Sequence, residues 1–390
     1  MSGVYLDASA TTPPAAEVIA AMAAVQAQAW ANPSSLHGFG LAAAEALERA
    51  RWQCADLLGC RPQELVFTSG GTEAIHLALV GAAACLPVGR LLISAVEHPA
   101  TEAAALQLQA WGWQIQRLPV NREGLLNQAQ LAVALEPPTR LVSLIWGQSE
   151  VGSLQDLQAL GGLCRRAGVP LHVDAVQVVG HCPVDFNSLP VELLSLAGHK
   201  LQGPRGIGAL LVREGLALQG VIGGGGQEGG RRGGTEAVVL AAGLARALEL
   251  AQARQCGPGE RDPLAKLRDG LLDPLLSLPG VQLTGPDPRR AAARRLPHHL
   301  SLLVSTEGGQ PLSGRALVRE LWREGLAVSS GSACHSSGSA ASAVLMALGF
   351  SEAQATSGLR LSLGPWLTPA DLAGVPAALQ RARQRLASNP

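Results

Sequence analysis

Short apolar segments that do not alternate with polar residues recur between residues 65 and 212. They occupy residues 65–67, 91–96, 141–146, 171–173, 191–196 and 206–212. Stretches rich in Ala, Leu, Gln or Glu, typical of helices, lie before and between them, at 15–29, 41–58, 72–85, 101–111, 127–135 and 155–167. A strand that is apolar on both sides belongs in a sheet that is covered on both faces, so the sequence predicts an α/β fold.

The pattern changes after four consecutive glycines at 223–226. A long helical stretch over 236–255 leads to Gly257-Pro258-Gly259, a composition typical of a boundary between lobes. Beyond it the sequence predicts helices near 264–277 and 312–324, strands at 300–304 and 359–363, and a closing helix. We expect these elements to form a smaller lobe, in which the Arg- and Pro-containing stretch 286–297 is a disordered or variable insertion.

The composition is that of a globular protein without a strong electrostatic field. Over 390 residues, 47% are hydrophobic and 15% are charged, which is enough apolar material for a packed core. Lys+Arg and Asp+Glu both total 30, so the formal net charge of zero gives no reason to expect a nucleic-acid or membrane partner. We expect the arginine pairs at 289–290 and 294–295 to be solvated loop charges.

Cysteine usage and the N-terminal sequence both favour a cytoplasmic location. The seven cysteines, at 54, 60, 85, 164, 182, 256 and 334, form no CxxC pair, which fits a reducing compartment. Residues 1–30 lack the basic start and apolar core of a secretory signal. The longest apolar stretch, 74–88, is interrupted and too short to span a bilayer. The spacing of histidines and cysteines predicts no metal site, and adjacent His298 and His299 suit a loop.

Two residues are candidates for covalent chemistry. Cys334 lies among small polar residues, in Ser329-Ser330-Gly331-Ser332-Ala333-Cys334. A thiol in a pliable polar segment can reach a reaction partner, so Cys334 is a candidate nucleophile. Lys200 follows an apolar run, in Gly198-His199-Lys200, where it can form an imine with a carbonyl cofactor. The alternative for Lys200 is an ordinary surface lysine.

Two strand ends are suited to holding a charged cofactor. Residues 68–73 follow a strand and open a helix, so the backbone N–H groups near Gly71 and Thr72 form a suitable phosphate cradle; alternatively Thr72 is an ordinary N-cap. Asp174 comes at the carboxyl end of a buried strand, where ligands of open α/β sheets collect. Its carboxylate can pair with a protonated pyridine nitrogen or can cap the next helix.

Three further polar residues have both a functional and a structural interpretation. His98 follows the strand at 91–96 and could lie over a flat ring and move protons, or be a satisfied structural histidine. Arg360 lies within an apolar strand, where its charge needs a partner, either a substrate carboxylate or an internal salt bridge. Asn32 is by default a turn residue.

Together these segments arrive in an order that matches one family. The chain resembles the cysteine desulfurases of the class-V aminotransferase group from Tyr5 to Ser362, over more than nine-tenths of its length. The segments that carry the resemblance are 5–7, 10–13, 32–35, 67–70, 97–98, 172–175, 198–200, 203–204, 206–210, 234–235 and 329–334. Gly198-His199-Lys200 and the Ser-Ser-Gly-Ser-Ala-Cys run are the specific ones, and the latter is similar to the long-loop subgroup.

The resemblance implies the fold, the cofactor and the site. We expect a fold-type-I transferase, with a mainly parallel seven-stranded sheet in a large domain (15–256) and a small α+β domain (1–14 and 257–390) that carries Cys334. Pyridoxal 5'-phosphate would be the cofactor and L-cysteine the substrate. Carried over by position, the implied roles are the imine on Lys200, the pyridine nitrogen on Asp174, ring stacking by His98, the phenolic oxygen near Gln177, the phosphate on Gly71, Thr72 and His199, and the substrate on Arg360 and Asn32. Thr235 resembles a residue lent to the neighbouring phosphate, which implies a homodimer.

The sequence departs from the family at two cofactor positions. Ser149, in Gly147-Gln148-Ser149-Glu150, stands where the family has an amide, and Ala197 stands where a serine usually binds phosphate. A hydroxyl at 149 reaches less far than an amide, and an alanine at 197 removes a donor. The chain also ends about 30 residues after Arg360 (390 − 360), where many relatives carry a scaffold-docking tail.

The resemblance implies conversion of L-cysteine to L-alanine, with a persulfide on Cys334 that supplies sulfur for iron–sulfur clusters or another thio-cofactor. A sulfur-acceptor protein, such as an iron–sulfur scaffold, would be a transient partner. Two alternatives remain open. The same fold could serve a selenocysteine lyase or a cysteine/cystine lyase. The departures at Ser149 and Ala197 also allow a low-activity paralogue that acts as a sulfur-relay partner.

Overall fold

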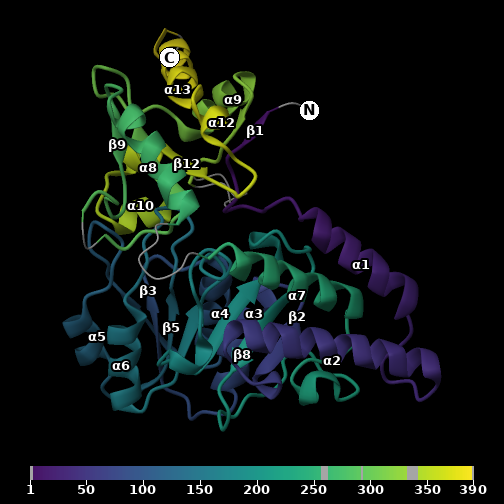
Figure 1. Ribbon diagram of the computed structural model, residues 1–390. Coiled ribbons are helices and arrows are strands. Elements are labelled where there is room, and N and C mark those ends of the chain that lie inside the picture. The colour runs from purple at the N-terminus through teal and green to yellow at the C-terminus, as the bar shows by residue number, and fades with distance from the viewer. Residues whose placement is uncertain (1–2, 256–261, 291–292, 332–340, 389–390) are drawn as a thin grey trace.

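The computed structural model describes residues 3–255, 262–290, 293–331 and 341–388. Its centre is a seven-stranded sheet in the order β2-β8-β7-β6-β5-β3-β4 (Figure 1). The strands are β2 (Leu65–Thr68), β3 (Arg90–Ser94), β4 (Gln114–Leu118), β5 (Thr139–Ile145), β6 (Leu171–Asp174), β7 (Leu193–Ala197) and β8 (Gly208–Val212). Only β8 runs antiparallel to its neighbours in this sheet, so the predicted mainly parallel seven-stranded sheet is confirmed.

Helices cover both faces of this sheet. They are α1 (Ala16–Gln28), α2 (Gly38–Leu58), α3 (Gly71–Ala83), α4 (Pro99–Ala110), α5 (Gln128–Ala134), α6 (Leu157–Ala167) and α7 (Val238–Ala253). One apolar cluster packs α3 and α4 against Leu91 and Leu210, whereas another packs α2, α6 and α7 against Leu92 and Leu211. Successive residues of a strand point to opposite faces, so burial of both faces explains why these strands do not alternate with polar residues.

The edge strand β4 was not predicted. Its residues Gln114 to Arg117 are partly or fully exposed and only Leu118 is buried, so this strand lacks the apolar run that marks the others. It pairs in parallel with β3 and ends the sheet. An edge strand needs an apolar neighbour on one side only, which is why its sequence carries a weak signal.

The remaining elements form a second layer around a three-stranded antiparallel sheet, above the large sheet in Figure 1. The sheet comprises β9 (Val281–Leu283), β10 (His299–Val304) and β12 (Gly358–Ser362), with helices α8 (Pro263–Leu276), α9 (Gly314–Arg323), α10 (Ala343–Ala347), α11 (Glu352–Ala355), α12 (Pro369–Leu372) and α13 (Val375–Ser388). Near the N-terminus, β1 (Val4–Tyr5) pairs with β11 (Leu326–Ala327). Leu6 shares an apolar cluster with Leu300 and Leu361. The proposed boundary at residue 256 lies outside the described residues, so the two-domain division stays a prediction.

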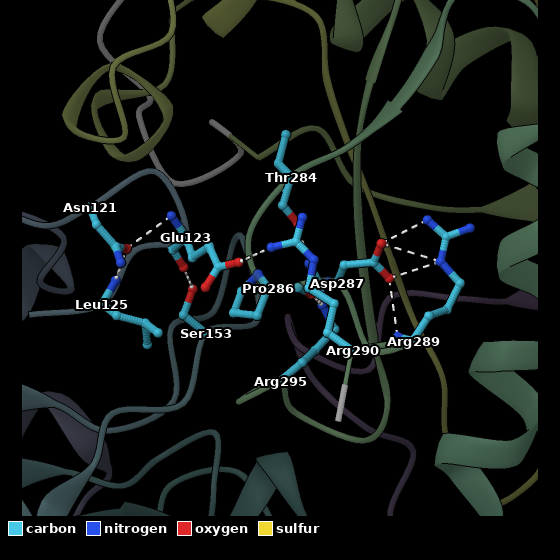
Figure 2. Close-up of polar contacts among 10 residues, drawn as sticks. All are labelled: Asn121, Glu123, Leu125, Ser153, Thr284, Pro286, Asp287, Arg289, Arg290 and Arg295. Atoms are coloured by element: carbon cyan, nitrogen blue, oxygen red, sulfur yellow. Dashed lines mark hydrogen bonds and ion pairs between the residues drawn. The ribbon is translucent and has the colours of Figure 1, made fainter. Parts of the chain in front are cut away.

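The stretch 286–297 is held in place where the structure describes it, contrary to the expectation of disorder (Figure 2). Arg295 is buried and donates to the carbonyl oxygens of Pro286 (2.6 Å), His299 (3.2 Å) and Thr284. Burial lowers the pKa of the Arg295 guanidinium to about 9. Arg295 is therefore not the solvated loop charge that we expected, whereas Arg290 is exposed and reaches Glu123 at 3.0 Å.

Within the described residues, no helix combines the length and the apolar character that a bilayer crossing requires.

Candidate active site

A cavity of about 300 Å³ opens where strands of the large sheet end beside β12. Nine of the predicted site residues line it: Gly71, Thr72, His98, Ser149, Asp174, Gln177, His199, Lys200 and Arg360. Asp174 is the last residue of β6, and Lys200 follows β7 in a 3₁₀ turn (Gly198–Lys200). Parallel strands present their carboxyl ends at one edge of the sheet, which brings these distant residues together.

Lys200 is held by the N-terminal segment of the chain. Its Nζ donates to the carbonyl oxygens of Ser9 (2.5 Å) and Ala10 (2.8 Å). The neighbouring backbone is fixed by Thr12, whose Oγ1 donates to the His199 carbonyl at 2.8 Å and accepts from the Gln202 N–H at 2.7 Å. The amine therefore lies on the cavity wall and is not an ordinary surface lysine.

Asp174 places a carboxylate in a nearly dry part of the cavity. It is 3% exposed, and its Oδ1 accepts from the Val176 N–H at 2.9 Å. Burial raises the pKa of the Asp174 carboxyl, while His98, that N–H bond and Lys200 act in the opposite direction. A buried anion is stabilised by a cation placed against it, so this position suits a protonated heterocycle.

His98 has the structural role that the alternative interpretation described, and it also lines the cavity. It caps α4, with Nδ1 accepting from the Ala100 N–H at 3.1 Å. Burial lowers the pKa of the imidazole, the Asp174 carboxylate opposes this shift, and Lys200 adds to it. A neutral ring whose Nδ1 accepts a hydrogen bond must carry its proton on Nε2, so Nε2 is the donor.

The start of α3 lies on the cavity wall, where the sequence predicts a phosphate cradle. The helix begins at Gly71, and the capping residue is Gly70, not Thr72, with no side-chain cap bond. The first N–H groups of a helix have no acceptor within it, so this end favours an anion. A Cβ at Gly71 would lie 2.8 Å from Val176 Cγ2, which explains a glycine here.

His199 faces the same cavity from the lysine turn. Its Nδ1 lies 3.2 Å from Thr11 Oγ1. Burial lowers the pKa of its imidazole to about 4, and the charges of Lys200 and Arg205 act in the same direction. At neutral pH His199 is therefore an uncharged side chain that can donate a hydrogen bond to a phosphate oxygen.

Arg360 is anchored by an internal salt bridge, as the structural interpretation expected. The residue is 6% exposed; its Nη2 lies 2.7 Å from Asp7 Oδ1, and its Nη1 donates to the Ser149 carbonyl at 3.0 Å. Its Nε is buried and finds no acceptor in the part of the chain that the structure describes. The guanidinium is thus oriented by the protein and retains a donor for a ligand.

Unpaired polar atoms in the cavity indicate a polar ligand. Ser9 Oγ and Gln177 Oε1, like Arg360 Nε, are buried without a hydrogen-bond partner among the described residues, and all three residues line the cavity. Each such atom costs about 1–3 kcal/mol when left unpaired. The amine, the buried carboxylate and the helix end make the cavity suitable for pyridoxal phosphate, which carries an aldehyde, a basic ring nitrogen and a phosphate.

Three predicted residues do not line this cavity. Asn32 and Thr235 border a separate hollow beside Trp30, between the start of α7 and the end of α1. Cys334 lies outside the described residues. Ser329, which lines the cavity, precedes Cys334 by five positions (334 − 329).

Sequence reasoning gave no role to three carboxyl groups near the site. Asp7 pairs with Arg360, Glu150 is buried beside Gly331, and Glu97 accepts from Ser94 Oγ at 2.5 Å and the Ile145 N–H at 2.9 Å. Burial raises the pKa of Glu97 to about 8. Asp7 and Glu97 lie in two of the segments that carry the family resemblance, 5–7 and 97–98. Their partners come from distant parts of the chain, so no local pattern reveals these contacts.

The loop expected for the adjacent histidines is found at His298 only, which lies in the turn before β10, whereas His299 begins the strand. Both are buried: His299 donates to the Ser149 carbonyl at 3.0 Å, and His298 stacks on His181 with ring centroids 3.7 Å apart. No cluster of three or more potential metal-binding side chains occurs in the described ranges.

The fold and the site together define a fold-type-I transferase with a lysine and a carboxylate facing one cavity. Residues 4–375 match the family model described as aminotransferase class-V, and the chain belongs to this family.

Relatives with assigned names are cysteine desulfurases. The chain is 36% identical over 386 residues to the cysteine desulfurase IscS of Methanosarcina thermophila, covering 97% of this chain and 93% of that protein. It is 39% identical over 376 residues to a cysteine desulfurase of Cereibacter sphaeroides, covering 95% and 93%.

Solved structures agree with this assignment. A NifS-like protein, 29% identical, superposes with a TM-score of 0.87 over 99% of this chain and 100% of that chain. SspA in complex with cysteine, 30% identical, gives a TM-score of 0.80 over 94% and 100%.

Proposed function

We propose that this protein is a pyridoxal-phosphate-dependent cysteine desulfurase that converts L-cysteine to L-alanine and transfers sulfur to Cys334. The observation that carries the proposal is that Lys200, Asp174 and Arg360 line the same cavity as Ser329, which lies five residues before Cys334 in the sequence. The names of the relatives support the same substrate. One of the similar solved structures is described as SspA in complex with cysteine.

Each cavity residue has a task that its surroundings favour. Pyridoxal phosphate, when bound, supplies an electron sink for the substrate's α-carbon. Asp174 would balance a positive ring nitrogen, and the start of α3 with His199 would hold the phosphate. Lys200 would hold the aldehyde group and could take up the α-proton at its amine, while His98 could deliver a proton from Nε2.

Arg360 is suited to bind the carboxylate of the amino acid. Asp7 and the Ser149 carbonyl orient its guanidinium from one side, and Nε remains as a buried donor. A carboxylate at that donor would convert an unpaired buried atom into a charge-assisted hydrogen bond. This contact would fix the amino acid with its sulfur away from the arginine.

Sulfur transfer requires a thiol, and no cysteine occurs among the described residues that line the cavity. The Cys334 thiolate attacks the substrate sulfur, a new S–S bond forms, and the C–S bond breaks with its electron pair left on the substrate carbon, which is then protonated to give alanine. Five residues of chain span at most about 17 Å, so the connection from Ser329 allows the thiol to reach the cavity. The persulfide is then available to a sulfur-acceptor protein.

We propose a homodimer, supported by an exposed apolar surface around the α1–α2 connection. Trp30, Leu36, Phe39 and Leu41 are 62%, 91%, 63% and 56% exposed. Large apolar groups gathered on one surface are typical of a protein interface. Thr235 borders the hollow beside Trp30, so a second chain docked there would bring Thr235 close to the interface, where it could reach the partner's phosphate.

The second proposed partner is the acceptor of the persulfide sulfur, in the synthesis of iron–sulfur clusters or another thio-cofactor. A cytoplasmic location stays the expectation from the cysteine content, as does the two-domain division.

The visible spectrum of the purified protein, before and after L-cysteine is added, tests the cofactor and substrate together. We expect the absorbance of a lysine-bound pyridoxal imine, changed by L-cysteine, and L-alanine as the organic product. Cys334→Ala should retain the spectral change and lose sulfide release without added reductant. Pyruvate as the product would identify a β-eliminating lyase instead, and release at the wild-type rate in Cys334→Ala would overturn the persulfide mechanism.

A further inference from the structure

The glycine-rich segment 223–235 is held in place by Glu228, which has an unusual backbone conformation. Glu228 has φ +50°, in the left-handed region that residues other than glycine seldom adopt, and its side chain is 2% exposed. Its carboxylate forms a bidentate pair with Arg51 of α2, at 2.7 and 2.9 Å, and accepts from the Phe67 N–H of β2 at 2.9 Å. A strained backbone persists only where its contacts hold it, so these bonds fix the segment to the large sheet.

A second ion pair joins the same segment to the phosphate cradle. Arg232 Nε lies 3.0 Å from Glu73 Oε1, in the first turn of α3. The other Glu73 oxygen accepts from the Ser69 N–H at 2.8 Å. Glu228 through the Phe67 N–H and Arg232 through Glu73 therefore both contact residues 67–73, the strand-to-helix junction that presents Gly71 and Thr72 to the cavity, while the Arg51 pair holds Glu228 against α2.

The anchors lead directly to the backbone of Thr235. Gln227 Oε1 accepts from the N–H groups of Gly225 (3.0 Å) and Gly234 (3.1 Å), closing the segment on itself. The two arms touch so closely that a Cβ on Gly233 would lie 2.5 Å from the Gly224 Cα. Gln227, the neighbour of Glu228, is thus bonded directly to the residue before Thr235, which gives a route by which the position of Glu228 can affect Thr235.

We propose that Glu228 and Arg232 are positioning residues that hold Thr235 in the conformation in which it reaches the phosphate of the partner subunit. The inference rests on the proposed cofactor and homodimer. In each chain, Thr235 is thus held by contacts to the residues of that chain's own phosphate cradle, although Thr235 itself would bind the phosphate of the partner subunit. Weakening the anchors should then reduce cofactor retention in the neighbouring site while the fold of the chain remains.

A double-mutant cycle with Thr235 tests this role. Glu228→Gln keeps the size of the side chain and an acceptor for Phe67 but removes the charge that faces Arg51. We expect Glu228→Gln and Thr235→Ala each to raise the dissociation constant for pyridoxal phosphate by about tenfold, the scale of one weakened hydrogen bond to a charged group. Because Glu228 acts through Thr235, the double variant should be no worse than Thr235→Ala alone.

The matched control is Arg49→Gln, which breaks the exposed Arg49–Glu45 pair on α2 and should leave the dissociation constant unchanged. Sedimentation and thermal unfolding of the apo-protein should show an intact dimer in every variant. If Glu228→Gln fails to fold, Arg232→Gln takes its place, because the Arg232 side chain is more exposed. The inference is overturned if Glu228→Gln, or Arg232→Gln in its place, binds pyridoxal phosphate with the wild-type dissociation constant. It is also overturned if the double variant with Thr235→Ala shows the product of the two single effects.

Mixed dimers separate positioning from general destabilisation. One chain carries Lys200→Ala, so that the only covalent site belongs to the other chain. With Glu228→Gln placed in the Lys200→Ala chain, the remaining site should lose cofactor about tenfold faster, since that chain lends the Thr235. If the faster loss of cofactor instead occurs when Glu228→Gln is placed in the chain that keeps Lys200, the inference is contradicted. An unchanged constant in Thr235→Ala would refute the lent residue itself, and with it the dimer site of the proposed function.

Discussion

Replacing Arg360 with lysine tests whether this guanidinium binds the substrate carboxylate. Its Nη2 contacts Asp7, its Nη1 donates to the Ser149 carbonyl, and its Nε has no acceptor among the residues that the structure describes. A lysine keeps the charge but concentrates it at one point, so it cannot hold both protein partners and still present a donor to the substrate. Losing one hydrogen bond to a charged group costs about 1.5–3 kcal/mol, which corresponds to a loss of roughly 13- to 160-fold in affinity.

The assay measures L-alanine formation as a function of L-cysteine concentration. We expect the loss for Arg360→Lys to appear mainly as a higher KM, because the carboxylate is bound before and during the reaction alike. Arg383→Lys is the matched control: Arg383 is also buried, but its guanidinium donates to the Ser305 carbonyl at 2.9 and 3.1 Å and does not line the cavity. A KM within twofold of wild type for Arg360→Lys would refute the carboxylate role.

Three further predictions concern pH and the cofactor pocket. Burial lowers the pKa of His172 to about 3, so between about pH 3 and about pH 6.5 the unfolded chain binds a proton that the native chain does not. The free energy of unfolding should therefore fall by up to about 1.4 kcal/mol for each pH unit below about pH 6.5. Urea titrations at several pH values should show a weaker dependence of this free energy on pH for His172→Gln, and an identical dependence would contradict the assignment. Gly71→Ala should weaken pyridoxal phosphate binding at least about tenfold in a spectroscopic titration, since its Cβ would lie 2.8 Å from Val176 Cγ2; unaltered binding would show that the cradle tolerates a side chain. Ala197→Ser adds a hydroxyl to the cavity wall and should slow cofactor loss on dilution by about 13-fold or more, because one hydrogen bond to a charged group is worth about 1.5–3 kcal/mol; an unchanged rate would show that the hydroxyl does not bind the phosphate.

The residues that sequence reasoning placed correctly share a local signal. Asp174 ends the buried strand β6 and Lys200 follows the buried strand β7, and these strands are parallel neighbours, so both side chains reach the same edge of the sheet. The errors arose where the local pattern allowed two outcomes. Thr72 had an alternative interpretation as an N-cap, which is wrong because the cap is Gly70 and Thr72 lies inside the first turn. Arg295 looked like a solvated charge, but three backbone carbonyls surround it.

The sequence by itself determined the α/β architecture and the candidate residues. Apolar strands must be covered on both faces, and the polar residues that follow them must collect at the carboxyl edge of the sheet. Only the tertiary structure decided which groups became partners. Asp7 reaches Arg360 across 353 positions, and Glu228 reaches Arg51 across 177. Pairings over such separations depend on how the packed elements meet in space, which hydrophobic periodicity and local propensity do not encode.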